Sequence, residues 1–96
     1  MSYQLNLDSL VDASTSVPKH TQRDAFMHLV EEVGELSVNI NRPEKAGECL
    51  AGEVADVLNC AIDIYILEYG TDLSFLQEQL DKKCLKWKTQ ALRKAI

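Results

Sequence analysis

The chain has 96 residues, of which 46% are hydrophobic, only four are glycine and two are proline, and its formal net charge is −5. This apolar fraction excludes a disordered chain, and the scarcity of glycine and proline argues against a sheet-rich fold with many tight turns. The acidic balance argues against a nucleic-acid polymer as partner, because proteins that bind such polymers carry basic surface that neutralises phosphate.

The cysteines and the lack of long apolar runs predict where the protein works. Cys49, Cys60 and Cys84 form no C-x-x-C pair, so they indicate reduced thiols rather than a disulfide framework or a zinc site. The sequence shows no signal peptide and no run of about 20 apolar residues that would predict a membrane span. We therefore expect one cytoplasmic domain over residues 1–96, with no membrane partner.

Two helices are predicted in the first half of the chain from apolar residues at helical spacing. The first, Tyr3–Ala13, is short, and the polar stretch Ser14–His20 is expected to break the chain after it. The second runs from about Thr21 to Ile40. Its first residue and Asp24 resemble a capping start, in which each side chain satisfies a backbone N–H of the other residue.

Two further helices are predicted in the second half. One runs from Glu44 or Gly47 to Tyr69 and is apolar nearly all round at its centre, which is typical of a helix buried in a bundle. The other runs from about Leu73 to Lys94. Its predicted core side consists of leucines, with Trp87 at the edge: Leu73, Leu76, Leu80, Leu85 and Leu92. No segment alternates as a strand does, so the predicted fold is all-α, an antiparallel bundle of about four helices completed by dimerisation.

Two pairs of acidic residues share one spacing on consecutive predicted helices: Glu32 with Glu35, and Glu53 with Asp56. Residues three apart on a helix lie about 60° apart around its axis, so both members of a pair can point at one place. If the two helices pack antiparallel, four carboxylates converge, and a divalent cation relieves their repulsion and their loss of water. Oxygen ligands of this kind suit Mg²⁺ or Mn²⁺.

The same spacing is also common on solvated helix faces, and we interpret Glu78 and Asp81 in that way. Glu53 differs because it shares a sector of its helix with apolar residues, which is an unfavourable place for an unpaired carboxylate. A polar line runs along the same helix: Asp56, Asn59 and Asp63. Taken alone, these residues leave a metal site and a plain solvent edge as open alternatives.

At these residues the sequence resembles the MazG-like all-α nucleoside triphosphate pyrophosphohydrolases. The signature of that family is E-E-x-x-E followed by E-x-x-D, which here reads Glu31-Glu32-Val33-Gly34-Glu35 and Glu53-Val54-Ala55-Asp56. The surrounding strings LVEEVGEL and EVADVLN are similar to those of the family, and the resemblance covers roughly residues 26–69.

The resemblance implies a helical dimer or tetramer that cleaves nucleoside triphosphates to a monophosphate and pyrophosphate. It assigns four Mg²⁺ ligands, with Mn²⁺ as a substitute: Glu32, Glu35, Glu53 and Asp56. The nucleophile would be a water activated by the metal, with Glu31 or Glu32 as the base. Lys83 and Lys86 on the last helix would contact the phosphates. Asn59 and Asp63 are candidates for reading the nucleobase, with a structural hydrogen bond as the alternative for Asp63.

Two other functions stay open from the sequence. A non-enzymatic helical homo-oligomer, acting as a partner-binding or regulatory module, would carry the acids on a solvent face. A di-iron carboxylate bundle would need Glu-x-x-His pairs, and neither His20 nor His28 follows a glutamate by three residues. The base and sugar of the nucleotide, and a role in nucleotide-pool housecleaning or in signalling, are also left open.

Overall fold

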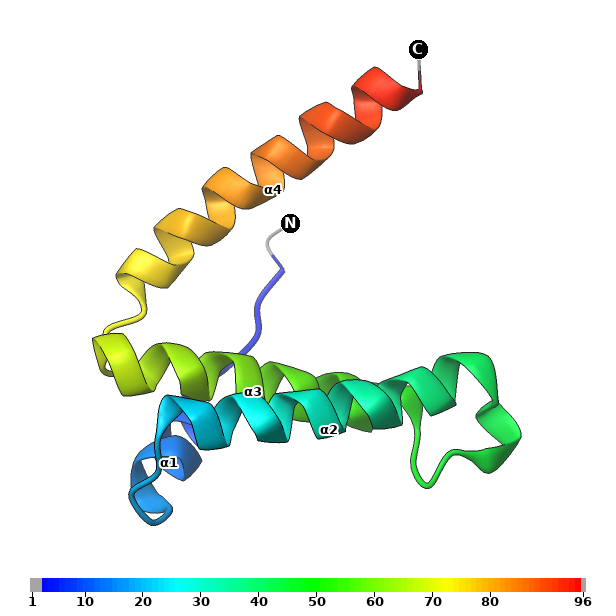
Figure 1. Ribbon diagram of the computed structural model, residues 1–96. Helices are drawn as coiled ribbons and strands as arrows, with labels where there is room; N and C mark the ends of the chain where they lie inside the picture. The colour runs from blue at the N-terminus through cyan, green and yellow to red at the C-terminus, as the bar shows by residue number, and fades with distance from the viewer. Residues whose placement is uncertain (1–2, 96) are drawn as a thin grey trace.

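The computed structural model describes residues 3–95, and these form four α-helices and one 3₁₀ turn without any strand. The elements in chain order are α1 (Asp8–Ser16), α2 (Gln22–Asn41), η1 (Pro43–Lys45), α3 (Leu50–Tyr69) and α4 (Ser74–Lys94). Figure 1 shows α2 and α3 lying side by side, with α1 below one end of the pair and α4 projecting away from it. The predicted all-α class is confirmed. Within the described part of the chain, every helix is too short or too polar to cross a bilayer.

Helices α2 and α3 form the centre of the molecule and run antiparallel (Figure 1). The start of α2 is the predicted capping box: Thr21 Oγ1 accepts from the backbone N–H of Asp24 at 3.1 Å, and Asp24 Oδ2 accepts from that of Thr21 at 3.0 Å. The buried apolar residues all lie on these two helices: Ala25, Cys60, Ile62 and Ile66. A core this small gives one copy of the chain little apolar burial to offset the entropy lost on folding.

Helix α1 begins and ends later than predicted. Its start is fixed at Asp8, whose backbone N–H donates to Asn6 Oδ1 at 2.8 Å. The helix then continues into the polar stretch expected to break it and stops at Ser16. Val17 is extended, as expected of a residue before Pro18, because the proline ring clashes with a helical conformation of its predecessor. The predicted break is therefore present within the stretch Ser14–His20, but the helix extends further into this stretch than predicted.

The start of α3 also differs from the prediction, because the chain does not enter this helix directly after Pro43. Residues 43–45 form the turn η1, and a loop follows before the helix begins at Leu50. The side-chain amide of Asn39 on α2 donates to the carbonyl of Glu48 at 2.8 Å and holds this loop against α2. The end of α3 at Tyr69 is as predicted, and Gly70 follows with φ 84°, a conformation that glycine adopts without strain.

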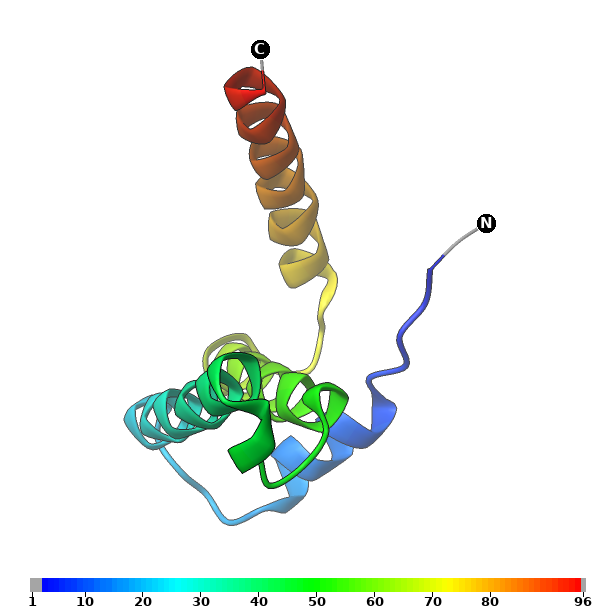
Figure 2. The ribbon, with the colours of Figure 1, turned by 90° about the vertical axis from the view of Figure 1, so that its right-hand side faces the viewer.

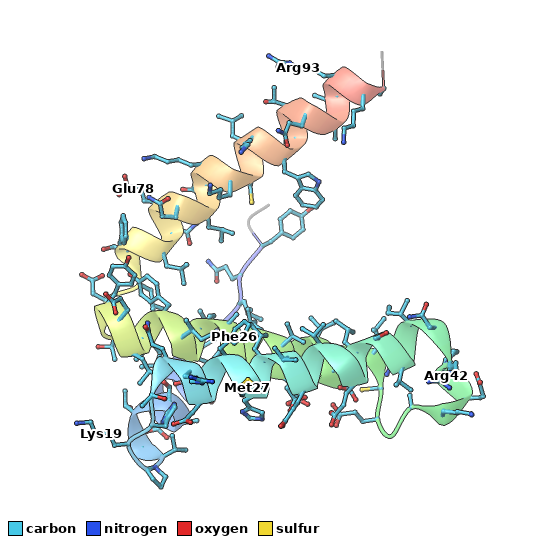
Figure 3. All side chains as sticks on the ribbon, in the orientation of Figure 1. Lys19, Phe26, Met27, Arg42, Glu78 and Arg93 are labelled. Atoms are coloured by element: carbon cyan, nitrogen blue, oxygen red, sulfur yellow. The ribbon has the colours of Figure 1, made fainter. Side chains whose placement is uncertain are left out.

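Helix α4 does not pack along the α2–α3 pair, so the predicted four-helix packing is only partly formed within one copy (Figures 1 and 2). Among the described residues, contacts hold it at its base: Tyr65 Oη donates to the carbonyl of Asp72 at 3.0 Å, and the rings of Tyr69 and Phe75 meet edge-on at 5.3 Å. Of the residues expected on its core side, Leu80, Leu85 and Leu92 are exposed, and Figure 3 shows most side chains of α4 standing clear of the α2–α3 pair. Along most of its length, the apolar side of α4 therefore has no packed neighbour among the described residues.

Candidate metal centre

The structure brings the four predicted acidic residues together across the α2–α3 interface. One carboxylate oxygen of each residue lies within 4.8 Å of those of the other three: Glu32, Glu35, Glu53 and Asp56. The convergence follows from the antiparallel packing of α2 and α3, because each pair spaced by three residues points from its own helix toward the other. The predicted geometry is thus confirmed, and we call this group the four-carboxylate cluster.

Glu53 lies deepest in the cluster and is only 4% exposed. Its Oε2 atom, and that of Glu32, are buried and have no hydrogen-bond partner. Buried polar atoms in native proteins are nearly always paired, because an unpaired one has lost its water without compensation. Two unpaired carboxylate oxygens in one converging group therefore fit a bound cation. Such a cation would compensate both oxygens for the loss of water.

The charges around the cluster also favour a bound positive charge. Burial, followed by the charge of Glu35, raises the pKa of Glu32 above its usual range. Burial also raises the pKa of Glu53, and the largest charge effect on it comes from Glu48. Among the described residues the only ion pair to this group joins His28 Nε2 and Glu32 Oε1 at 3.2 Å. The cluster therefore has too little positive charge within the chain, and it favours a proton or a cation.

The chemistry of the four carboxylates determines which kind of cation they would prefer. All four groups are carboxylates, which are hard oxygen ligands preferred by Mg²⁺ and Mn²⁺ rather than by softer metals. Within the described residues the group contains no histidine, so it lacks the Glu-x-x-His arrangement that the di-iron alternative requires. The cluster fits one hard divalent cation.

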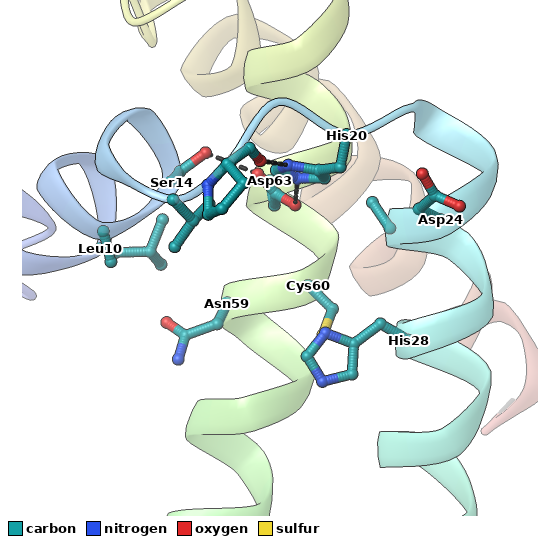
Figure 4. Close-up of a pocket in the computed structure, with 12 residues that line it drawn as sticks. Leu10, Ser14, His20, Asp24, His28, Asn59, Cys60 and Asp63 are labelled. Atoms are coloured by element: carbon teal, nitrogen blue, oxygen red, sulfur yellow. Dashed lines mark hydrogen bonds and ion pairs between the residues drawn. The ribbon is translucent and has the colours of Figure 1, made fainter.

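A pocket of about 430 Å³ lies between α1, α2 and α3 (Figure 4), and two of its residues lie one helical turn from the cluster. His28 precedes Glu32 by one turn on α2, and Asn59 follows Asp56 by one turn on α3, and both line the pocket. Its other walls are mostly apolar, including Leu10, Ala13, Val17, Ala25 and Cys60. Apolar walls with a few polar groups, at this volume, are typical of small-molecule sites.

One side of this pocket is held by a hydrogen-bond network around Asp63 whose partners the sequence did not predict (Figure 4). Asp63 on α3 accepts from Ser14 Oγ at Oδ1 and from His20 Nε2 at Oδ2, both at 2.6 Å, and His20 Nδ1 donates to the carbonyl of Pro18 at 2.9 Å. These hydrogen bonds, first that to Pro18 and then that to Asp63, raise the pKa of His20. Both ring nitrogens donate only in the protonated imidazole, so the network ties α1 and its loop to α3 through a charged histidine.

The remaining predicted site residues are placed as follows. Asn59 is exposed at the pocket, whereas both carboxylate oxygens of Asp63 already accept hydrogen bonds, as its structural alternative anticipated. Glu31 is exposed and lies outside the four-carboxylate cluster. Lys83 and Lys86 are exposed on α4, which projects away from the α2–α3 pair (Figure 1). The roles assigned to these five residues in substrate binding or catalysis stay predictions.

Comparisons of this chain with protein families, with curated proteins and with solved structures found no match in any of the three. The resemblance to the MazG-like enzymes therefore rests on the two acidic motifs and the sequence around them. The four-carboxylate cluster rests on its own geometry.

Proposed function

We propose that this protein is a Mg²⁺-dependent nucleoside triphosphate pyrophosphohydrolase, which releases pyrophosphate and a nucleoside monophosphate. The observation that carries the proposal is the four-carboxylate cluster with its two orphaned, buried oxygens. A solvated acidic face would not explain a glutamate that is 4% exposed and has an unpaired carboxylate oxygen. The resemblance of the acidic motifs to the MazG-like signature supports pyrophosphate release as the reaction.

Glu32, Glu35, Glu53 and Asp56 would hold the cation, which when bound supplies positive charge for the phosphates and makes water more acidic. A protein with a net charge of −5 needs such charge to bind a polyanionic triphosphate. Glu31 lies outside the cluster, so its carboxylate remains available to accept a proton from the attacking water. Glu32 is the second candidate for this base.

The pocket beside the cluster supports a nucleotide as the substrate. Its volume of about 430 Å³ lies within the range of small-molecule sites, and its apolar walls suit the faces of a nucleobase. Asn59 at its edge offers an amide that both donates and accepts hydrogen bonds. With the nucleoside in this pocket, the phosphates would extend along α2 and α3 toward the cluster, one helical turn away.

Pyrophosphate release from a panel of standard and damaged nucleoside triphosphates tests this function. We expect at least one nucleotide to yield its monophosphate and pyrophosphate in equal amounts when Mg²⁺ is present, and no turnover after chelation of the metal. Release of orthophosphate instead would contradict the bond assigned to cleavage. Absence of turnover across the whole panel, with Mg²⁺ and with Mn²⁺, would favour the partner-binding module.

We also propose that the protein works as a homodimer, in which a second copy covers the apolar side of α4. A groove of about 920 Å³ lies between the base of α4, α3 and the N-terminal segment 3–7, and its apolar lining from the two helices is Leu58, Ile62, Leu73, Leu76 and Leu80. At 100° per residue, Cys84 and Trp87 continue this side of α4, whereas Leu85 and Leu92 lie on another side. Trp87 is 74% exposed and Leu80 is 51% exposed. One continuous stripe along a projecting helix favours a helix–helix interface.

Substituting Trp87→Glu is expected to convert the dimer to a monomer at micromolar concentration, because a charge would replace a large apolar contact at the interface. The matched control is Thr89→Glu, which adds the same charge on the opposite side of α4 and should leave the dimer intact. Sedimentation velocity measures both. A wild-type chain that sediments as a monomer at all concentrations would contradict the dimer, as would a Trp87→Glu variant that remains dimeric.

A further inference from the structure

Residues 8–20, which comprise α1 and the loop that follows it, form one wall of the pocket between α1, α2 and α3 (Figure 4). We call this segment the lid. It supplies half of the lining residues: Leu10, Ala13, Ser14, Val17, Pro18 and His20. Ala25 and Cys60 line the pocket from the other two helices and are 4% and 5% exposed. The pocket is therefore complete only while the lid lies against α2 and α3.

The lid is attached to the rest of the chain mainly through Asp63. No residue of α1 is buried, so apolar packing contributes little to its attachment. Among the described residues, two hydrogen bonds join the lid to another helix, and Asp63 on α3 accepts both, from Ser14 Oγ and from His20 Nε2, each at 2.6 Å. A segment held by so few interactions can open while the α2–α3 pair stays folded.

The hydrogen bond from His20 depends on the protonation of its ring. Nδ1 lies 2.9 Å from the carbonyl oxygen of Pro18, and Nε2 lies 2.6 Å from Asp63 Oδ2. Because both partners are acceptors, the protonated ring satisfies both, whereas a neutral ring has one N–H and turns a lone pair toward the other oxygen. Loss of the proton also removes an ion pair whose two side chains are only 22% and 18% exposed. Deprotonation therefore weakens the attachment of the lid.

The other titratable groups around the pocket do not perform the same role. They come from α2 and α3, and none comes from α1: Asp24, His28, Cys60 and Asp63. The negative charges of Asp63 and Asp24 both favour the protonated form of His20. His28 forms its ion pair with a residue of its own helix, and burial raises the pKa of the Cys60 thiol. His20 is therefore the titratable residue that belongs to the lid and also pairs with α3.

We propose that residues 8–20 are a movable lid on the pocket and that the ion pair between His20 and Asp63 is its latch, which is closed while His20 is protonated and opens when the proton leaves. The two hydrogen bonds that meet on Asp63, and the lack of buried residues in α1, carry the inference. The latch itself needs no nucleotide. Its effect on the substrate rests on the proposed function, in which the closed lid completes the apolar walls around the nucleoside.

Hydrogen exchange of the backbone amides of α1 tests the latch, with each rate expressed as a protection factor against the intrinsic rate at the same pH. In the wild-type chain we expect the protection of α1 to fall about tenfold between pH 6 and pH 9, because opening then no longer breaks a charge-assisted hydrogen bond. The amides of α3 are the internal reference and should stay protected. Equal protection of α1 at both pH values would overturn the proposal.

Two variants identify the group that titrates. His20→Gln cannot become charged and Asp63→Asn cannot form an ion pair, so in each we expect low protection of α1 at both pH values. The matched control is Asp12→Asn, the same chemical change at an exposed position of the lid outside the latch, which should keep the pH dependence of the wild type. A His20→Gln lid that responds to pH as the wild type does would also overturn the proposal.

The outcomes separate the latch from the proposed function, because hydrogen exchange needs no nucleotide. A wild-type chain whose lid loses protection at pH 9 but which hydrolyses no nucleotide would support the latch and contradict the hydrolase. A wild-type chain that hydrolyses a nucleotide, and whose lid is equally protected at both pH values, would support the hydrolase and contradict the latch.

Discussion

Replacing Glu53 with glutamine is expected to reduce Mg²⁺-dependent pyrophosphate release by about a thousandfold, the order of loss seen when a group that stabilises transition-state charge is removed. The amide has nearly the same shape as the carboxylate, but it has no charge and binds a hard cation weakly. The same change removes a buried charge that is repelled by Glu48 and Glu35. We therefore expect the metal-free variant to unfold at a higher temperature than the metal-free wild type.

A loss of activity together with a higher Tm in the metal-free variant distinguishes a metal ligand from a carboxylate with a structural role. The matched control is Glu68→Gln, the same chemical change at an exposed position on the same helix, which should change neither activity nor Tm. Steady-state rates with the best nucleotide and thermal melts in the presence of a chelator provide the readouts. A Glu53→Gln enzyme that keeps activity within about threefold of the wild type would contradict the ligand role.

The second large effect concerns how stability depends on pH and on Mg²⁺. The folded-state pKa values of Glu32, Glu48 and Glu53 are raised, so between the ordinary glutamate value of about 4.3 and those raised values the folded chain binds more protons than the unfolded chain. Stability therefore falls as the pH rises through this window. The raised pKa of His20 has the same sign, and its contribution is lost as the pH rises above about 6.5.

A divalent cation is expected to reverse this loss at pH 8, far above the ordinary pKa of a glutamate. At a Mg²⁺ concentration about a hundred times its Kd, binding adds about 2.7 kcal/mol to the free energy of unfolding, and for a domain of this size the Tm rises by about 10 °C or more. At pH 5 the rise should shrink, because protons compete for the same oxygens. Thermal melts at both pH values measure the effect.

Glu53→Gln serves as the control for that experiment, because it should lose most of the rise in Tm at pH 8. A rise of equal size in this variant would place the binding of Mg²⁺ elsewhere on the chain. A metal-free wild type that becomes more stable between pH 5 and pH 8 would contradict the raised pKa values of the cluster.

Much of the fold and of the metal centre could be predicted because local patterns determine them. Thr21 and Asp24 mark the start of α2 through hydrogen bonds between residues three apart. The burial of Glu53 follows from its place among apolar residues on α3. The convergence of the cluster needed only one further step, the antiparallel packing of two neighbouring helices. These features depend on the spacing of residues close together in the chain, and this spacing can be read from a single sequence.

The features that the sequence did not reveal depend on contacts between distant residues or on loops. His20 and Asp63 are separated by 43 positions, so their hydrogen bond has no local signature. Glu48, whose charge acts on the buried Glu53, lies in a loop, where no helical periodicity places it near the cluster. The direction of α4 could not be predicted for a related reason. Its apolar stripe predicts a packing partner, but the stripe is the same whether that partner is a helix of this chain or a second copy.

The central claim is that the carboxylates of Glu32, Glu35, Glu53 and Asp56 jointly hold a divalent cation. Anomalous diffraction from crystals grown with Mn²⁺ and a non-hydrolysable nucleoside triphosphate tests this most directly. We expect a manganese peak about 2 Å from oxygens of all four residues, with phosphate oxygens of the nucleotide on its open side. Well-ordered nucleotide density, or manganese peaks, found only away from these four side chains would contradict it.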